Sequence, residues 1–322
     1  MKKYVCALLV ILMLICVLAG CGAENAAENS GKLSIVTTIF PEYDWVMNVL
    51  GSKASDAEVA MLLDSGVDLH SYQPTADDMI RISRCDLFIY VGGESDAWVE
   101  DALKEATNKD MLVIDLLDVL GDAVKEEEVK EGMEAGEDEE EGEAEYDEHV
   151  WLSLKNAAVF VGAIRDALVA LDAENAESYN ANASAYIEKL NALDAGYQAA
   201  VDAARIKTVL FGDRFPFRYL TDDYGLDYYA AFVGCSAESE ASFETVAFLA
   251  GKVDELGLST VLTLEGTDHK IAETIVSASK DSSAQILSMD SMQSTTSQDV
   301  KNGATYLSIM EKNLGVLTDA LK

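Results

Sequence analysis

The first half of the chain alternates short runs of apolar, often β-branched residues with segments in which apolar positions recur every three or four residues. The runs at residues 33–38, 59–63, 87–91 and 111–115 have the length of buried strands. The segments between them, at residues 44–50, 77–84 and 96–105, have the spacing of amphipathic helices. Strands that alternate with helices in this way predict a parallel sheet with helices on both faces.

The second half repeats the alternation of strands and helices. Strands are predicted at residues 208–211, 227–232, 260–264 and 284–287, and helices at residues 217–224, 242–256, 269–279 and 305–321. Between the two halves, residues 154–171 are predicted to be helical. Apolar residues then recur in steps of three and four from Ala183 to Val201, which predicts one helix over about residues 174–204.

A helix of that length, about 45 Å at 1.5 Å per residue, is too long for a crossover within a small sheet. We therefore expect it to link two lobes. The predicted fold class is α/β, with two lobes that are each a mainly parallel sheet flanked by helices. The lobes are expected at residues 33–172 and 206–322, with the linking helix at 173–205. A cleft between them places ligands outside the carboxyl ends of the strands.

The N-terminus has the layout of a bacterial signal sequence. Lys2 and Lys3 precede an apolar run at residues 5–20, which is shorter than the ~20 residues that a transmembrane anchor needs. The run ends in Leu18-Ala19-Gly20-Cys21, which resembles a lipobox, whose cysteine is lipidated and becomes the first residue of the mature chain. We predict a signal peptide at residues 1–20, lipidation of Cys21, a polar tether at 21–32 and a location on the outer face of the cytoplasmic membrane.

Composition excludes several classes of protein. A net charge of −35 argues against nucleic acid as a partner, because binding phosphates requires clustered Lys and Arg. Five cysteines without a Cys-x-x-Cys pair argue against a zinc ribbon, an iron–sulfur cluster or a disulfide scaffold. Cys85 and Cys235, which lie in the mature domain, are expected to be two free thiols. Residues 125–148 include 14 acidic residues and two lysines, which predicts a loop without packed elements that is either passive or gathers cations.

Two of the three histidines fall at comparable positions of the predicted fold. His70 lies in a loop beyond the strand at 59–63, and His149 lies between the acidic loop and the helix at 154–171. Both positions are on the strand-exit side of the first lobe, so we interpret the two imidazoles as candidate metal ligands. His269 follows Gly266-Thr267-Asp268 at a helix start and is expected to be exposed.

The second lobe offers carboxylates and a cysteine at its strand exits. Asp213 follows the strand at 208–211, Glu265 follows the strand at 260–264, and Asp290 follows the strand at 284–287. Each of these carboxylates is alternatively a helix N-cap, because a strand exit is also a helix entry. Cys235 is a further candidate if its thiolate faces the cleft. Two imidazoles with one or two carboxylates suit Zn²⁺ or Mn²⁺.

The segments Asp-Leu-His-Ser-Tyr-Gln-Pro-Thr around His70 and Asp-Glu-His-Val-Trp-Leu-Ser-Leu around His149, together with the lipobox, resemble the zinc- and manganese-binding lipoproteins of bacterial ABC importers. The likeness to these cluster A-I solute-binding proteins covers nearly the whole mature chain. It implies that His70, His149 and Asp290 bind Zn²⁺ or Mn²⁺, and that a monomeric, non-enzymatic protein delivers the ion to an ABC permease.

The chain departs from this family at the expected third ligand. The family has His or Glu shortly before a Phe-x-Tyr, where this chain has Arg214, which cannot ligate a cation. Asp213 is the nearest replacement and Glu265 a second.

Two other functions stay open. One is a metal-dependent hydrolase with Glu265 or Asp213 as its base, although the usual hydrolase motifs are absent from the sequence. The other is an adhesin or a binding protein for a non-metal solute, in which Arg214 and Arg218 bind an anion.

Overall fold

The computed structural model describes residues 32–134, 146–236, 240–280 and 282–322. The predicted signal peptide, the predicted lipidation site Cys21, most of the predicted tether and the middle of the acidic loop lie outside these residues. Contacts divide the chain into the units Met1–Leu33 and Ser34–Lys322, and the fold lies in the second. Among the residues described, no helix combines the length and apolar character needed to cross a membrane.

The first sheet has four strands in the order β2-β1-β3-β4. Its strands are β1 (Leu33–Thr37), β2 (Ala57–Met61), β3 (Leu87–Tyr90) and β4 (Leu112–Asp115). The pairings of β1 with β3 and of β3 with β4 are parallel. Leu87, Phe88 and Ile89 are fully buried, as expected for a central strand covered on both faces. The helices of this half are α2 (Phe40–Leu50), α3 (Ala76–Arg84), α4 (Val99–Lys104), α5 (Leu116–Leu120) and α6 (Leu154–Leu171).

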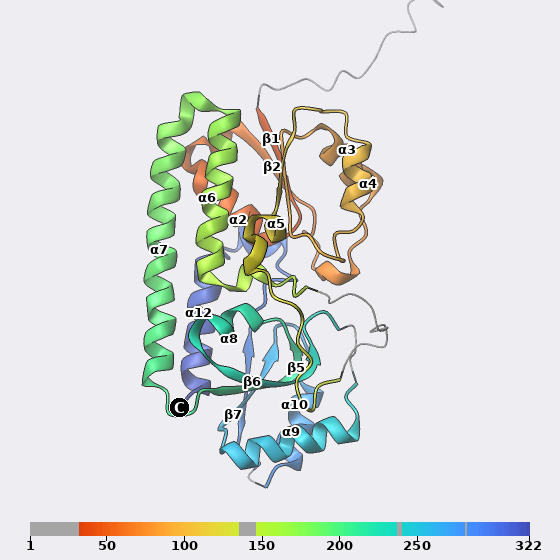
Figure 1. The fold of residues 1–322 in the computed structure, drawn as a ribbon, viewed down its shortest axis with the longest axis vertical. Coiled ribbons are helices and arrows are strands. Elements are labelled where there is room, and N and C mark those ends of the chain that lie inside the picture. The colour runs from red at the N-terminus through yellow and green to blue at the C-terminus, as the bar shows by residue number, and fades with distance from the viewer. Residues whose placement is uncertain (1–31, 135–145, 237–239, 281) are drawn as a thin grey trace, which may run out of the picture. The chain divides into compact units, whose positions relative to one another are not determined.

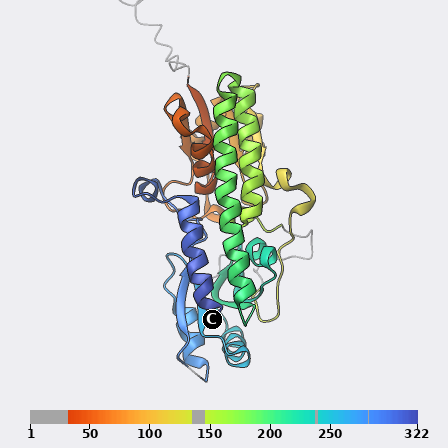
Figure 2. The ribbon, with the colours of Figure 1, turned by 90° about the vertical axis from the view of Figure 1, so that its left-hand side faces the viewer.

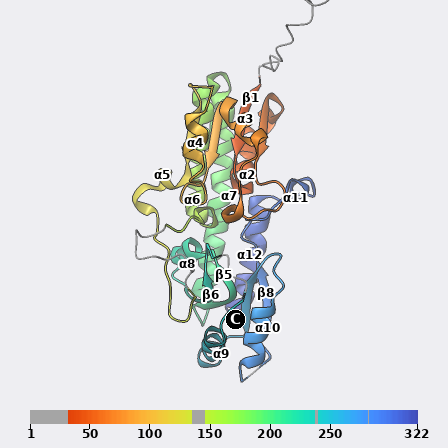
Figure 3. The same cartoon turned by 90° about the vertical axis from the view of Figure 1, so that its right-hand side faces the viewer.

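The second sheet repeats this topology with the order β6-β5-β7-β8, and all of its pairings are parallel. Its strands are β5 (Thr208–Phe215), β6 (Asp227–Val233), β7 (Thr260–Leu264) and β8 (Gln285–Met289). The helices are α8 (Arg218–Tyr224), α9 (Phe243–Leu256), α10 (Lys270–Ala278), α11 (Ser297–Lys301) and α12 (Tyr306–Ala320). Helices α9 and α10 pack on β5, β6 and β7, and α12 packs on β7 and β8 (Figure 3). The predicted α/β architecture of two mainly parallel sheets is confirmed.

The long helix α7 (Ala176–Ala203) contacts helices that belong to both halves of the fold. Its 28 residues span about 42 Å at 1.5 Å per residue. It packs against α2 and α6 of the first half and against α8 and α12 of the second (Figures 1 and 2). Helix α12 also contacts α2, so two helices bridge the halves where one was expected.

Strand β5 is longer than predicted. It continues through Gly212 and Asp213 to Phe215, with a shift in its register to β6 between Phe211 and Arg214. The prediction that Asp213 follows the strand was therefore wrong, because a bulge carries the strand past a Gly-Asp pair that resembles a turn. Helices α5 and α11, each of five residues, were not predicted.

Asp44 of α2 forms a buried polar contact with α7. It is 7% exposed, and its Oδ2 accepts hydrogen bonds from the hydroxyl of Tyr186 and from the side-chain amide of Asn48, both at 3.0 Å. Burial raises the pKa of Asp44 from 3.8 to about 6, although the Tyr186 hydroxyl opposes this. The folded protein therefore holds the proton of this carboxyl more tightly than the unfolded chain does.

This raised pKa predicts a loss of stability with increasing pH. As the pH rises from about 4 to about 6, the unfolded chain releases the proton first, so the free energy of unfolding falls by up to about 3 kcal/mol. An Asp44→Asn variant does not titrate, and its stability relative to the native protein should increase over that interval. Urea unfolding of both proteins at several pH values measures this difference. Asp166→Asn, at an exposed position of α6, is the control, and a flat difference for Asp44→Asn contradicts the prediction.

Candidate metal centre

His70 lies in a short 3₁₀ turn, Leu69–Ser71, beyond β2. The turn begins at Asp68, whose Oδ1 accepts a hydrogen bond from the backbone N–H of His70 at 3.0 Å. The Nδ1 atom of His70 lies 2.8 Å from the hydroxyl of Ser95 and 3.6 Å from Oε2 of Glu148. Because both neighbours can accept a proton from Nδ1, they favour the tautomer in which Nε2 carries a free lone pair.

His149 is fully buried just before the 3₁₀ turn Val150–Leu152 that leads into α6. Its Nδ1 lies 3.0 Å from Oδ1 of Asp147, which also accepts the backbone N–H of His149 at 2.9 Å. The next ring along the chain, Trp151, is also fully buried and donates to the carbonyl of Ser291 at 2.8 Å. Asp147 therefore fixes the ring of His149 with its Nε2 lone pair free, an arrangement typical of metal-binding histidines.

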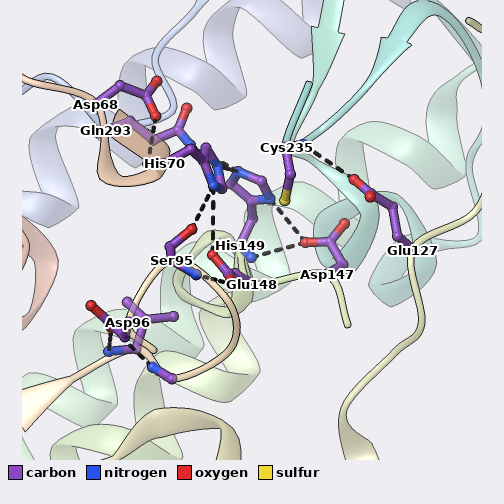
Figure 4. A network of polar contacts seen from close by, with 12 residues as sticks. Asp68, His70, Ser95, Asp96, Glu127, Asp147, Glu148, His149, Cys235 and Gln293 are labelled. Atoms are coloured by element: carbon purple, nitrogen blue, oxygen red, sulfur yellow. Dashed lines mark hydrogen bonds and ion pairs between the residues drawn. The ribbon is translucent and has the colours of Figure 1, made fainter. Parts of the chain in front are cut away.

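The two Nε2 atoms point toward one another and lie 3.2 Å apart (Figure 4). The side-chain amide nitrogen of Gln293, in the loop after β8, lies 3.1 Å from Nε2 of His70 and 2.8 Å from Nε2 of His149. An amide has two N–H groups, so it donates one to each imidazole. The two lone pairs thus converge on one point, where a positive charge would relieve their mutual repulsion.

The environment of His70 keeps its ring neutral. Burial and the neighbouring His149 lower the pKa of His70 from 6.5 to about 3, while Asp68 opposes the shift. A ring with so low a pKa is unprotonated at neutral pH. Its nitrogen therefore remains available to a metal ion, which binds only deprotonated imidazole.

A third possible donor atom lies close to the two imidazoles, on a residue that follows a strand of the second sheet. Among the described residues, His70, His149 and Cys235 each place one ligand atom within 4.8 Å of the others. Cys235 follows β6, and neither it nor Cys85 is in a disulfide, as predicted. Burial, with the carboxylates Glu127, Glu148 and Asp147, raises the pKa of Cys235 well above its usual value, which favours the protonated thiol over the thiolate.

The three carboxylates predicted from the sequence are not part of this cluster. Asp213 accepts the backbone N–H groups of Arg214 at 2.9 Å and Leu264 at 3.1 Å. Glu265 accepts the backbone N–H and the hydroxyl of Ser291 at 2.8 and 2.7 Å. Burial and Asp290 raise the pKa of Glu265 to about 7.

Asp290 shapes the loop that carries Gln293. Its Oδ1 accepts the N–H of Met292 at 2.8 Å, and its backbone exchanges two hydrogen bonds with the side chain of Asn313 on α12. Met292 has a φ of +64°, which is unusual for a residue with a side chain. Asp290 and Glu265 therefore hold the turn from which Gln293 reaches the two histidines.

Arg214 occupies the position at which a ligand was expected in β5. Its guanidinium donates to Oδ2 of Asp68 at 2.9 Å and to the carbonyl of Ser236 at 3.4 Å. Asp68, near His70 in the chain, and Ser236, next to Cys235, both line a cavity of about 510 Å³ that Arg214 also lines. His269 lines the same cavity, half-buried rather than exposed as predicted, with a φ of +57°. Arg214 thus joins the two candidate ligand loops.

Part of the acidic loop follows the second sheet as a strap, here defined as residues 125–134. No helix or strand was predicted there and none forms in its described parts. Glu127 accepts the backbone N–H of Cys235 at 3.1 Å, and Glu128 forms an ion pair with Arg218. At the end of the strap, Glu134 pairs with β6 through its backbone N–H, which donates to the carbonyl of Ala231 at 2.9 Å. The described part of the loop is therefore fixed to β6 and α8.

Gln293 is the site residue that sequence reasoning missed. It follows a strand exit, as Glu265 and Asp290 do, but a search for ionisable ligands passes over an amide. The sequence feature that could have indicated Gln293 is its position in the loop after β8, at a strand exit of the second sheet. Cys235 had the same signal, at the exit of β6.

The chain is similar to several known proteins. A family model described as zinc-uptake complex component A, periplasmic (ZnuA), matches residues 35–320. The zinc-binding protein AdcA of Streptococcus pyogenes serotype M6 is 31% identical over 299 residues, which cover 89% of this chain and 56% of AdcA. The chain thus spans little more than half the length of that relative. The high-affinity zinc uptake system protein ZnuA of Bacillus subtilis is 29% identical, over 98% of this chain and 97% of that protein.

A solved structure has the same fold. The Zn(II)-bound ZnuA-like domain of Streptococcus pneumoniae AdcA matches with a TM-score of 0.71 and 30% sequence identity, covering 90% of this chain and 99% of that one. The family match extends over both sheets and includes both histidine loops. The chain therefore belongs to the ZnuA family, the periplasmic component A of zinc-uptake complexes.

Proposed function

We propose that this protein is an extracytoplasmic solute-binding lipoprotein that captures Zn²⁺ and delivers it to an ABC permease. The observation that carries the proposal is the pair of Nε2 atoms of His70 and His149, 3.2 Å apart with both lone pairs directed at one point. Each ring is fixed through its Nδ1 atom by a hydroxyl or carboxylate neighbour. Two preoriented imidazoles are a usual part of a zinc site.

The ion that best suits these donors is Zn²⁺ rather than Mn²⁺. Mn²⁺ favours oxygen ligands, and the three nearby carboxylates are all engaged by backbone N–H groups. Imidazole nitrogen suits Zn²⁺. The names of the matched proteins, a zinc-binding protein and a zinc uptake protein, support the same choice.

Delivery and anchoring are the remaining parts of the proposal. The family is described as a component of an uptake complex, which supports an ABC permease as the partner. The lipobox at Cys21 supports a lipid anchor that holds a monomeric protein at the outer face of the cytoplasmic membrane.

Binding, rather than catalysis, is the proposed role of the site. Asp213 and Glu265 were the two candidates for a general base. Both accept backbone hydrogen bonds, and neither belongs to the group that His70 and His149 form with Cys235. Neither carboxylate is therefore arranged to take a proton from a metal-bound water.

Calorimetric titration of the metal-stripped mature protein with Zn²⁺ and with Mn²⁺ tests the proposal. At about pH 7.5, where histidine is neutral, we expect one Zn²⁺ per protein with a dissociation constant of about 1 μM or lower, equivalent to about −8 kcal/mol. Mn²⁺ should bind much more weakly. Zn²⁺ binding that is only weak and spread over several sites would place the metal on surface carboxylates and overturn the proposal.

A further inference from the structure

We propose that Cys235 is the third metal-binding side chain and that its sulfur makes the site selective for Zn²⁺ over Mn²⁺. The inference rests on the proposed function and specifies its ligand chemistry. The observation behind it is that one ligand atom from each of His70, His149 and Cys235 lies within 4.8 Å of the other two. Figure 4 shows the side chain of Cys235 directed toward the ring of His149.

The backbone before Cys235 is shaped to approach His149 closely. A Cβ atom on Gly234 would lie 2.9 Å from Cε1 of His149 and 3.0 Å from the carbonyl oxygen of Phe215. Contacts that short require a residue without a side chain. Gly234 therefore lets the chain leave β6 against the imidazole and place the next residue, Cys235, beside the ring of His149.

The backbone at Cys235 is also held in place from outside the cluster. Its N–H donates to Oε1 of Glu127 in the strap at 3.1 Å. On the other side, Arg214 donates to the carbonyl of Ser236 and to Asp68, which caps the turn that carries His70. The loops of His70 and Cys235 are thus joined through one guanidinium, which fixes the thiol relative to the imidazole.

The other candidates for a third ligand are engaged elsewhere. Arg214 has no lone pair to offer and is paired with Asp68. Asp213 and Asp290 accept backbone N–H groups at 2.9 and 2.8 Å, and Glu265 is held by Ser291. Among the described ionisable residues, Cys235 alone joins the two histidines in a group of three.

A donor set of two nitrogens and one sulfur determines which ions bind. Thiolate is a soft ligand that Zn²⁺ accepts readily, with Zn–S bonds of about 2.3 Å. Mn²⁺ is bound mainly by oxygen and lies at the weak end of the order of affinities for divalent metals. Binding forms a metal–sulfur bond and releases the thiol proton to solvent, with no change in oxidation state.

Cobalt(II) is the probe that tests the thiolate directly. The metal-stripped mature protein, a Cys235→Ser variant and a Cys85→Ser variant are each titrated with Co²⁺ while near-ultraviolet absorption is recorded, and then with Zn²⁺ and Mn²⁺ by calorimetry. Cys85→Ser is the matched control, because Cys85 is the other free cysteine described and lies buried in the first half, where its Sγ contacts Met111 and the carbonyl of Ile82.

We expect a sulfur-to-cobalt charge-transfer band in the native protein and in Cys85→Ser, and its absence in Cys235→Ser. The affinity of Cys235→Ser for Zn²⁺ should fall by more than the roughly 10- to 100-fold that is typical when an outer-shell partner is lost. The ratio of its Zn²⁺ affinity to its Mn²⁺ affinity should therefore be smaller than in the native protein. Tight Zn²⁺ binding in Cys235→Ser and no band in the native protein would overturn the assignment of Cys235 and leave the proposed function intact. Failure of the native protein to bind Zn²⁺ or Co²⁺ would overturn both.

Discussion

Replacing both His70 and His149 with alanine should eliminate tight Zn²⁺ binding. The double variant removes the two nitrogen donors whose lone pairs converge 3.2 Å apart. What remains is a thiol with a raised pKa and an amide, and neither binds Zn²⁺ strongly without the imidazoles. The loss of affinity should exceed the roughly 10- to 100-fold seen for outer-shell changes and leave no site detectable by calorimetry at micromolar protein concentrations.

The control for this pair is His269→Asn. His269 is the third histidine of the chain, lies in the cavity beside Arg214 and has a φ of +57°, a conformation that asparagine tolerates well. This variant should bind Zn²⁺ as the native protein does. Equal thermal unfolding temperatures in the absence of metal establish that the double variant is folded. Retention of a tight site in a folded double variant would exclude the cluster as the place of binding.

Replacing Trp45 with alanine should lower the free energy of unfolding by about 3–5 kcal/mol. Trp45 of α2 is fully buried, and its ring lies 5.6 Å from that of Phe160 on α6 and 5.2 Å from that of Tyr306 on α12. The substitution leaves a cavity where α2, α6 and α12 meet, and it removes the T-shaped contact with Tyr306. Urea unfolding measures the change in free energy.

Two further variants serve as comparisons for the loss of stability in Trp45→Ala. Trp45→Phe keeps an aromatic ring and should lose less stability than Trp45→Ala, while Val159→Ala, at a half-exposed position of α6, should change it by no more than about 0.5 kcal/mol. A loss below about 1 kcal/mol for Trp45→Ala would mean that the three helices repack without the ring. The hydroxyl of Tyr306 also donates to the carbonyl of Trp151 at 2.6 Å. This hydrogen bond links the region where α2, α6 and α12 meet to the turn that follows His149.

Much of the fold follows from the pattern of apolar residues. Helix α6 begins and ends where it was predicted, because its 18 residues show a clear helical spacing of apolar positions. Strand β7 also has the predicted bounds, because it is a short buried run of mostly apolar residues. Strand β5 was predicted too short because Gly212 and Asp213 resemble a turn, although the bulge lets the strand continue. Helices of five residues, such as α5 and α11, are too short to show a helical period.

The candidate site could be predicted only in part. Loops after parallel strands converge at one edge of a sheet, so placing His70 and His149 at strand exits was enough to select them. Which side chain of the second sheet faces them depends on loop geometry, which apolar patterns do not encode. Asp213, Glu265 and Asp290 each accept a hydrogen bond from a backbone N–H, so they stabilise the loops. The side chains that lie close to the histidines are instead those of Gln293 and Cys235.

The strap has a consequence for the outer edge of the second sheet. Strand β6 is the last in the order β6-β5-β7-β8, and an outer strand offers unpaired N–H and C=O groups to any strand of another molecule. Glu134 occupies part of this row by pairing with Ala231 and Phe232 of β6. Another protein that binds by adding a strand to this sheet at β6 therefore meets backbone groups that Glu134 already pairs with.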